Sequence, residues 1–195
     1  MMKIKKALSI FNRFIYGHFG FKSLIYKPML VSGKRYIFIG KNVLFRNGAR
    51  IECINQRNTQ VFSPKISIGD NTSFEQFAHI ISTTDLIIGS NNLISARFFV
   101  STCSHTYSFV NIPITSQKLE SKPVKIGNNC FIGMDVKVFP GVTIGDNVII
   151  GANSIVTQDI PSFSVAVGSP AKVIKMYDFN TNRWIRIDKK GIDEI

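Results

Sequence analysis

The fold is decided by residues 126–156, which read IGNNCFIGMDVKVFPGVTIGDNVIIGANSIV. A branched aliphatic residue returns at every sixth position of this stretch: Ile126, Ile132, Val138, Ile144, Ile150 and Val156. A period of six matches neither the helical repeat of 3.6 residues nor the strand repeat of two. It suits a short strand followed by a turn, coiled so that each branched side chain stacks on its counterpart one coil above. We therefore predict an all-β parallel β-helix in which three six-residue units make one triangular coil.

The same pattern occurs upstream in shifted frames that begin at Ile39, Ile68 and Ile88, each followed by glycine. The insertions between these frames are predicted to be loops, at residues 55–67, 86–87 and 106–122. Glycine after the inward residue allows a tight corner that a Cβ atom would obstruct. Asparagine tolerates the left-handed backbone conformation, and it is expected to do so at these corners. The asparagines in question are Asn71, Asn91, Asn128 and Asn147.

Composition describes one soluble domain with enough apolar material for a core, since 45% of the 195 residues are hydrophobic. No stretch approaches the roughly 20 apolar residues that a membrane-spanning helix needs. Three cysteines at unrelated spacings indicate neither a disulfide framework nor a zinc knuckle, and a reducing cytoplasm fits them best. The segment from Met2 to Ser9 and the apolar run after it imitate a signal peptide, but Asn12, Arg13 and His18 interrupt that run and no cleavage site follows, so we expect the N-terminus to be retained.

The net charge of +12 belongs to the N-terminal part of the chain, because residues 1–50 contain eleven bases and no acid. Apolar residues recur there at helical spacing among Lys5, Lys6 and Arg13: Leu8, Phe11, Phe14 and Ile15. This pattern predicts an amphipathic helix. The helix could cap the open end of the β-helix, and its basic face would also allow peripheral contact with an anionic membrane.

Residues 126–160, together with Val167-Gly-Ser-Pro-Ala-Lys-Val-Ile174, resemble the hexapeptide-repeat acyltransferases, a family with a left-handed parallel β-helix. Within that family the chain looks most like the branch that O-acetylates sugars, including those of lipopolysaccharide and capsule. The resemblance covers about residues 36–176. It leaves residues 1–35 as a basic helical segment and 177–195 as a tail, with loop 106–122 projecting from the β-helix. It implies acetyl-CoA as the donor, no metal, a cytoplasmic homotrimer and active sites between neighbouring copies.

The resemblance implies that His105 is the catalytic residue, because it stands directly before loop 106–122, where the family has its catalytic histidine. Imidazole titrates near neutral pH and can accept a proton from a sugar hydroxyl. The chain departs from the Asp-His-x-His of many relatives, since Cys103 replaces the first histidine. A covalent thiol mechanism is the alternative that this cysteine suggests, and a small buried side chain is the simpler interpretation.

On the acceptor side, Glu75 lies where relatives often have an acceptor-binding asparagine, and His79 ends the same hexad. A carboxylate can accept hydrogen bonds from sugar hydroxyls, but it cannot donate one as an amide does. The alternative for His79 is a structural corner histidine.

On the donor side, the resemblance implies that a backbone N–H at the turn of Gly133 and Met134 faces the thioester carbonyl. Phe131 stands in place of a tryptophan beside the pantetheine arm, and Gln158 replaces a common lysine. The predicted coenzyme A-binding residues are Phe131, Gly133, Met134, Ala152, Thr157, Gln158, Lys172 and Lys175. Without the resemblance, Lys172 and Lys175 would be interpreted as solvated surface charges.

Other functions remain as alternatives. An amino-sugar N-acetyltransferase is the nearest, and a purely structural hexapeptide protein would be distinguished by failure to bind coenzyme A. A γ-type carbonic anhydrase needs closely spaced histidines on zinc, whereas only His79 and His105 fall within the repeats. Nucleic-acid binding is suggested only by the basic pI and is supported by no motif, so we expect no nucleic-acid partner.

Overall fold

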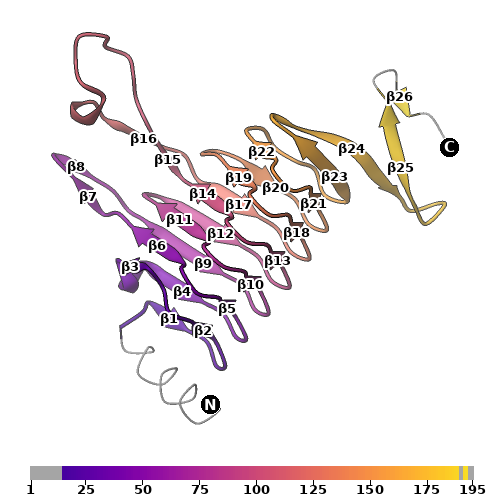
Figure 1. Cartoon of the computed structure of the whole chain (residues 1–195), viewed down its shortest axis with the longest axis horizontal. Helices are drawn as coiled ribbons and strands as arrows, with labels where there is room; N and C mark the ends of the chain where they lie inside the picture. The colour runs from indigo at the N-terminus through magenta and orange to yellow at the C-terminus, as the bar shows by residue number, and fades with distance from the viewer. Residues whose placement is uncertain (1–14, 189–190, 193–195) are drawn as a thin grey trace.

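The structure is a computed structural model that describes residues 15–188 and 191–192. The chain winds into stacked coils whose strands form three long sheets, named sheets A, B and C in the order in which each coil visits them (Figure 1). Strands of successive coils pair in parallel, which confirms the prediction of an all-β, parallel architecture.

Short strands make up the sheets, and most contain only two to four residues. Sheet A comprises β1 (His18–Phe19), β4 (Ile37–Ile39), β9 (Lys65–Ile68), β12 (Asp85–Ile88), β17 (Val124–Ile126) and β20 (Thr143–Ile144). Sheet B comprises β2 (Leu24–Ile25), β5 (Leu44–Phe45), β10 (Ser73–Phe74), β13 (Leu93–Ile94), β18 (Phe131–Ile132), β21 (Ile149–Ile150), β23 (Ser164–Gly168), β24 (Ala171–Asp178), β25 (Arg183–Asp188) and β26 (Gly191–Ile192). Sheet C comprises β3 (Leu30–Ser32), β6 (Arg50–Cys53), β11 (His79–Ser82), β14 (Phe99–Ser101), β19 (Lys137–Val138) and β22 (Ile155–Val156).

The core consists of three columns of inward side chains, one for each sheet. Within a column, each side chain is in register with those of the adjacent coils. The sheet A column contains Phe19, Ile39, Ile68, Ile88, Ile126 and Ile144. Every member is at most 4% exposed, so each contributes about 1.5–3 kcal/mol of hydrophobic stabilisation. In the sheet B column, the rings of Phe45 and Phe74 stack face to face with centroids 4.1 Å apart. The six-residue repeat is therefore the period of core contact.

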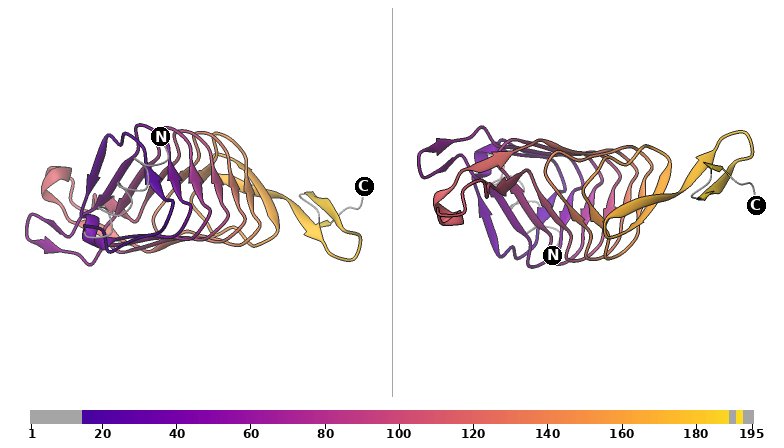
Figure 2. Two further views of the ribbon diagram at one scale, coloured as in Figure 1. Left: turned by 90° about the horizontal axis from the view of Figure 1, so that it is seen from below. Right: turned by 90° about the horizontal axis from the view of Figure 1, so that it is seen from above.

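The corner between sheets C and A is where the length of the coils varies. The inward residues of sheets A, B and C follow one another at intervals of six, as in Ile68, Phe74 and Ile80. From sheet C to sheet A the interval changes, and two antiparallel hairpins project there: β7 (Gln56–Arg57) with β8 (Gln60–Val61), and β15 (Cys103–His105) with β16 (Leu119–Ser121). Both lie on the same side of the molecule (Figures 1 and 2).

The predicted loop positions need two corrections. Residues 86–87 are part of β12 with Leu86 fully buried, and the two additional residues of that coil are Thr83 and Thr84. The chain also rejoins sheet A at Lys65, before the predicted end of loop 55–67. In an uninterrupted apolar run such as residues 86–88, the sequence alone does not show which side chains point inward, so the start of the next repeat is hard to locate. The connection between β15 and β16 contains a short 3₁₀ helix, η2 (Ile114–Ser116).

The predicted N-terminal helical segment is wrong for its described part, because the first coil begins before residue 36. Strands β1, β2 and β3 pair with β4, β5 and β6, and the 3₁₀ helix η1 (Lys34–Tyr36) completes this coil. Phe19, Ile25 and Val31 already repeat at intervals of six, and this signal could have identified the coil. Lys5, Lys6 and most of the predicted amphipathic helix lie outside the described residues.

The corners between sheets A and B show why glycine and asparagine recur. A Cβ atom on Gly127 would lie 2.6 Å from the carbonyl oxygen of Gly145 in the next coil, so close stacking excludes it. Asn71 and Asn91 adopt positive φ, and Asn71 Nδ2 donates to Asn91 Oδ1 at 3.0 Å. The prediction is wrong for Asn128, since its neighbour in the sequence has the positive φ. The Asn128 side chain instead accepts a hydrogen bond from Ser90 N at 2.8 Å.

The C-terminal strands leave the β-helix as an antiparallel arm (Figures 1 and 2). β23 pairs in parallel with β21 of the last coil and antiparallel with β24, which pairs with β25. The predicted tail therefore begins inside β24. No helix in the described ranges is long and apolar enough to cross a membrane.

Candidate active site

His105 ends β15, on the hairpin that leaves the coil at the corner between sheets C and A. It stands opposite Leu119 of β16, and its side chain is exposed. Hydrogen bonds of the buried Thr83 and Thr102 hold the base of this hairpin: Thr83 Oγ1 lies 2.8 Å from Ser121 Oγ, and Thr102 Oγ1 accepts a hydrogen bond from Thr83 N at 2.8 Å. The imidazole is accessible to a ligand from solvent, while hydrogen bonds tie the base of its hairpin to the coil below.

Arg57 contacts His105 from the other hairpin. Its Nη1 atom lies 3.4 Å from Nδ1 and 3.5 Å from Nε2 of the imidazole. The sequence does not point to Arg57, because 48 positions separate it from His105. The available signal was that insertions 55–67 and 106–122 interrupt the repeat at the same corner, so they must project from one edge.

Cys103 is a half-buried residue whose contacts are with Ser101. The Cys103 amide donates to Ser101 Oγ at 3.1 Å, and Ser101 Oγ donates to the Cys103 carbonyl at 2.9 Å. The thiol lies 3.6 Å from the same hydroxyl, and no hydrogen bond joins it to His105 within the described part of the chain. This environment fits a small structural side chain better than a thiol activated by an imidazole base.

His79 lies on the outer face of sheet C, between Arg50 of β6 and Phe99 of β14. Its ring meets that of Phe99 edge to face at 5.5 Å, and its Nε2 atom is buried without a hydrogen-bond partner. Burial lowers the pKa of His79, and the positive charge of Arg50 lowers it further, while Glu52 opposes both effects.

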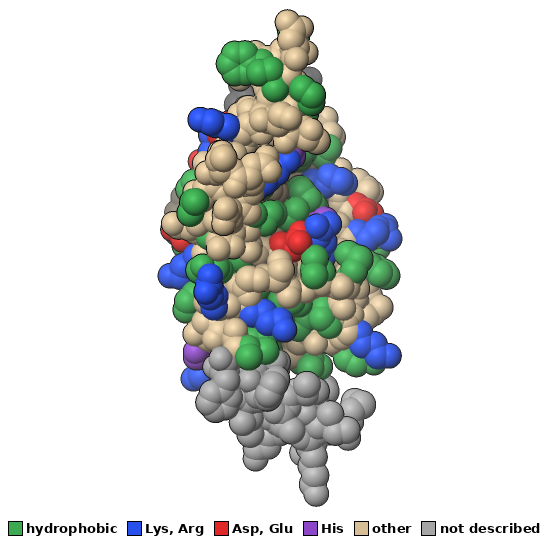
Figure 3. Space-filling model, turned by 90° about the vertical axis from the view of Figure 1, so that its left-hand side faces the viewer, with side chains coloured by type: hydrophobic (Ala, Val, Ile, Leu, Met, Phe, Trp, Pro, Cys, Tyr) green, Lys and Arg blue, Asp and Glu red, His purple; other side chains and the backbone are tan. Residues whose placement is uncertain are grey.

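Figure 3 shows charged side chains of both signs among hydrophobic ones in the middle of the face at the left of Figure 1.

Glu75 follows β10 at the corner between sheets B and C. Its carboxylate forms an ion pair with Arg46, whose Nε atom lies 2.9 Å from Oε2. His105 stands beyond the opposite end of sheet C, so one chain does not bring Glu75 and His105 together.

Gly133, Met134 and Ala152 lie at the corner between sheets B and C, in successive coils. A Cβ atom on Gly133 would lie 2.5 Å from Ala152 N, which shows how tightly these two turns stack. The Gly133 amide already donates to Ile150 O at 2.8 Å. Within residues 15–188, the Met134 amide has no hydrogen-bond partner, and so it is the donor of this turn that a ligand could use.

The remaining predicted donor-side residues lie toward the C-terminal end of the stack. Gln158 and Lys172 are brought together, with Lys172 Nζ 3.5 Å from Gln158 Oε1. Thr157, the neighbour of Gln158, is exposed after β22. Phe131 lies on the outer face of sheet B and is 42% exposed, in register with Leu93 and Ile149 of the adjacent coils.

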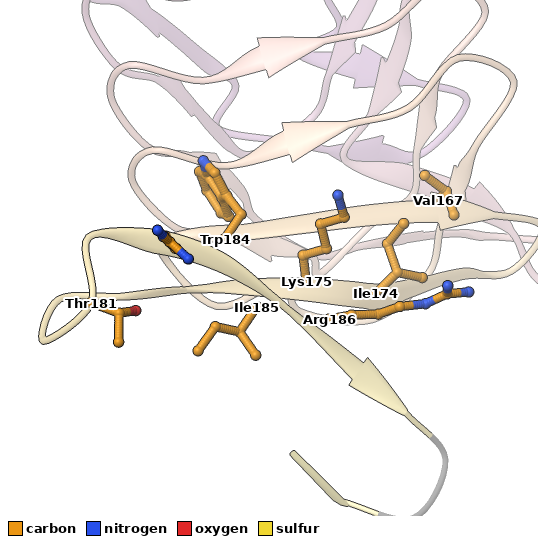
Figure 4. A pocket seen from close by; sticks show the side chains of 8 residues that line it. Val167, Ile174, Lys175, Thr181, Trp184, Ile185 and Arg186 are labelled. Atoms are coloured by element: carbon orange, nitrogen blue, oxygen red, sulfur yellow. The ribbon is translucent and has the colours of Figure 1, made fainter. Parts of the chain in front are cut away.

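A cavity of about 720 Å³ lies along the C-terminal arm. It is lined by Val167, Ile174, Lys175, Thr181, Arg183, Trp184, Ile185 and Arg186. Figure 4 shows Trp184 and Lys175 pointing to the same side of the arm. Three cations and an indole beside an apolar lining suit a planar ligand that carries phosphates. Of these residues only Lys175 is among the predicted ones, because Arg183, Trp184 and Arg186 lie beyond the repeat.

The described residues contain no group of three histidine, cysteine or acidic side chains that could hold a metal ion. The candidate catalytic and donor-binding residues form two separate groups within one chain. His105 lies with Arg57 at one end of sheet C, and the turn of Gly133 and Ala152 lies at the other end.

The family model described as "Hexapeptide repeat of succinyl-transferase" matches residues 123–158. The putative lipopolysaccharide biosynthesis O-acetyl transferase WbbJ of Escherichia coli is 33% identical over 164 residues, which cover 80% of each chain. Galactoside O-acetyltransferase of the same organism is 40% identical over 115 residues, covering 58% of this chain and 55% of that one. The solved structure of AntD, an N-acyltransferase from Bacillus cereus in complex with dTDP and 3-hydroxybutyryl-CoA, has the same fold, with a TM-score of 0.71, 20% identity and coverage of 89% and 90%.

Proposed function

Since this chain belongs to the family of hexapeptide-repeat acetyltransferases, we propose that it transfers the acetyl group of acetyl-CoA to a hydroxyl group of a sugar. The acceptor is a cell-surface polysaccharide, such as lipopolysaccharide O-antigen or capsule, or its precursor. The name of the WbbJ relative supports this acceptor class. The observation that carries the proposal is the exposed imidazole of His105 on a hairpin with a fixed base, at the edge of a hexapeptide coil.

His105 acts as the general base in this proposal. A neutral ring nitrogen takes the proton of the acceptor hydroxyl while the oxygen attacks the thioester carbonyl of the donor. The thiolate of coenzyme A leaves, and the imidazolium returns the proton to it. No enzyme-bound acetyl group forms, which agrees with the structural contacts of Cys103.

The Met134 amide is proposed to stabilise the negative charge on the carbonyl oxygen. A fixed backbone donor needs no reorganisation when the charge develops. Gly133 serves this turn by its small size, because its own amide is committed to Ile150 O.

Coenzyme A is proposed to bind along the outside of the C-terminal coils. Phe131 supplies an exposed apolar ring for the pantetheine arm, and exposed Ala152 leaves space at the corner. The nucleotide end, with its phosphates, binds near Thr157 and Gln158, between Lys172 and the cation-lined cavity that contains Lys175. The chemistry of these side chains fits a phosphorylated nucleotide.

Glu75 and His79 are proposed to bind the acceptor. The half-buried ring of His79 lies on the outer face of sheet C, where it can contact a sugar. The Glu75 carboxylate retains acceptor capacity while it is paired with Arg46.

A homotrimer with left-handed coils is proposed as the functional assembly. The separation of His105 from the Met134 turn within one chain supports a site between neighbouring copies. We further propose a cytoplasmic location, where acetyl-CoA is available. Peripheral contact of the basic N-terminal residues with anionic lipid would suit a lipid-linked acceptor.

A screen of candidate glycans, with released thiol as the readout, tests the proposed function. The panel pairs each sugar with its amino-sugar counterpart. Thiol release with the hydroxyl acceptor, and an O-acetyl ester in the product, is the expected result. Transfer to the amino sugars alone would establish N-acetylation, and failure to bind coenzyme A would indicate a structural protein.

A further inference from the structure

We infer that Arg57 is a specificity-determining residue that binds a carboxylate or phosphate group of the acceptor, so that the preferred sugar is anionic. This inference rests on the proposed function and deepens it. The geometry points to a guanidinium group held beside the base that deprotonates the acceptor.

Four residues form a closed ring of contacts that places Arg57. Arg57 pairs with Gln60 across the first hairpin, and His105 pairs with Leu119 across the second. The Gln60 side chain joins the hairpins: its Oε1 atom accepts from Leu119 N at 2.8 Å, and its Nε2 atom donates to Leu119 O at 3.1 Å. The contact of Arg57 with His105 closes the ring. Arg57 is therefore held by two hairpins rather than by chance proximity of long side chains.

The charge of Arg57 is not neutralised within the described residues. The ion pairs there join Arg46 to Glu75, Arg50 to Glu52, Arg97 to Asp135, and Lys122 to Glu120. Arg57 contacts an imidazole instead of a carboxylate. A guanidinium group presents its donors in a planar fork that matches a carboxylate or a phosphate, and such pairs are stronger than hydrogen bonds between neutral groups.

The contact with His105 also links anion binding to proton transfer. The Arg57 Nη1 atom lies at nearly equal distances from both ring nitrogens, and a neutral imidazole bears a lone pair on one of them. That lone pair is what a general base needs. When an anionic group of the acceptor draws the guanidinium onto itself, the nitrogen becomes available to the neighbouring hydroxyl of the same molecule.

Three acceptors test this inference: a neutral hexose, the corresponding hexuronic acid and the corresponding nucleoside diphosphate hexose. The wild-type enzyme is expected to show at least about 10-fold higher kcat/KM for one of the two anionic acceptors than for the neutral one. The acidic sugar and the sugar nucleotide distinguish a carboxylate from a phosphate. Equal values for all three acceptors would overturn the inference.

Arg57→Gln is expected to lower kcat/KM for the anionic acceptor by about 10–100-fold and for the neutral hexose by less than about 3-fold. Arg57→Lys, which keeps the charge but not the fork, should lie between them. Lys41→Gln removes a positive charge from the distant corner between sheets A and B, and it should change neither value. Equal losses for neutral and anionic acceptors would assign Arg57 to the support of His105 alone and overturn anion recognition.

Calorimetry with coenzyme A present separates this inference from the proposed function. Binding of the anionic acceptor should weaken at least about 10-fold in Arg57→Gln, even if no acetyl transfer occurs. Such binding without transfer in the wild type would reject the proposed function and leave the anion site in place. Transfer to anionic sugars with unchanged binding in Arg57→Gln would reject the anion site and leave the proposed function in place.

Discussion

Gly133 lies directly against Ala152 of the next coil, so closely that a Cβ atom on the glycine would be 2.5 Å from the Ala152 nitrogen and 2.9 Å from its Cα atom. Both contacts are with backbone, which cannot turn away as a side chain can. The φ angle of Gly133 is not positive, so the contact between coils, rather than backbone strain, requires glycine here. The same close approach creates the turn that presents the Met134 amide.

Gly133→Ala is expected to destabilise the protein by about 1–3 kcal/mol, because the added methyl group must separate two coils. Urea unfolding monitored by circular dichroism measures this loss. Ala152→Ser, at the exposed partner position, is the control and should remain within about 0.5 kcal/mol of the wild type. Unchanged stability of Gly133→Ala would mean that the coils can move apart at this corner without cost.

His105→Ala is expected to lower kcat by about 10²–10⁴-fold while coenzyme A binds nearly as before, since only the base is removed. Steady-state kinetics and calorimetry give the two quantities. Cys103→Ser should keep most of the activity, because the thiol contacts Ser101 and not His105. The reverse result, an essential Cys103 with a trapped acetyl-enzyme, would establish the covalent route.

A mixture of two inactive variants is expected to regain activity if the site lies between copies. Ala152→Trp should block the donor groove, and His105→Ala removes the base from the opposite end of sheet C. In trimers assembled from equal amounts of both, about a quarter of the sites would combine an intact base with an intact groove. Activity after joint refolding measures this recovery. Mixtures as inactive as their components would place both residues in one chain's site.

Lys172→Ala is expected to weaken coenzyme A more than dephospho-coenzyme A, if its ammonium contacts the 3′-phosphate. Loss of a hydrogen bond to a charged group corresponds to about 1.5–3 kcal/mol. Calorimetric titration with both ligands provides the comparison. Equal losses would move Lys172 to another phosphate of the nucleotide.

The free energy of unfolding is expected to decrease as the pH is lowered, in part because of His79. Its pKa in the folded state is lowered by burial and by Arg50, so the unfolded chain binds the proton more readily. The contribution of neutral His79 is therefore present above the pKa of the unfolded chain, about 6.5, and is lost as the pH falls through the lower pKa of the folded state. His79→Phe keeps an aromatic ring against Phe99 and should show a weaker pH dependence in urea unfolding. Identical pH profiles for the variant and the wild type would contradict this origin.

Most of the fold could be predicted from the repeat, whereas the site could be predicted only in separate pieces. The inward position of side chains such as Ile126 and Ile132 can be predicted, because the six-residue period is a local property of the sequence. The spacing of the insertions places both hairpins at one edge, but the contact of Arg57 with His105 depends on how the two hairpins lean together. The commitment of the Gly133 amide to Ile150 likewise depends on the stacking of coils.

The variation of chain length at a single corner has a consequence for how this architecture can acquire new specificities. Sheets A to B and B to C keep fixed intervals, so the wall that bears Met134 and Ala152 has the same form whatever is inserted elsewhere. The hairpins that bear Arg57 and His105 emerge where the intervals are free. The part of acceptor recognition that the hairpins supply can therefore be exchanged by grafting residues 54–64 and 103–121 from another protein of this architecture, while the donor-binding coils stay unchanged.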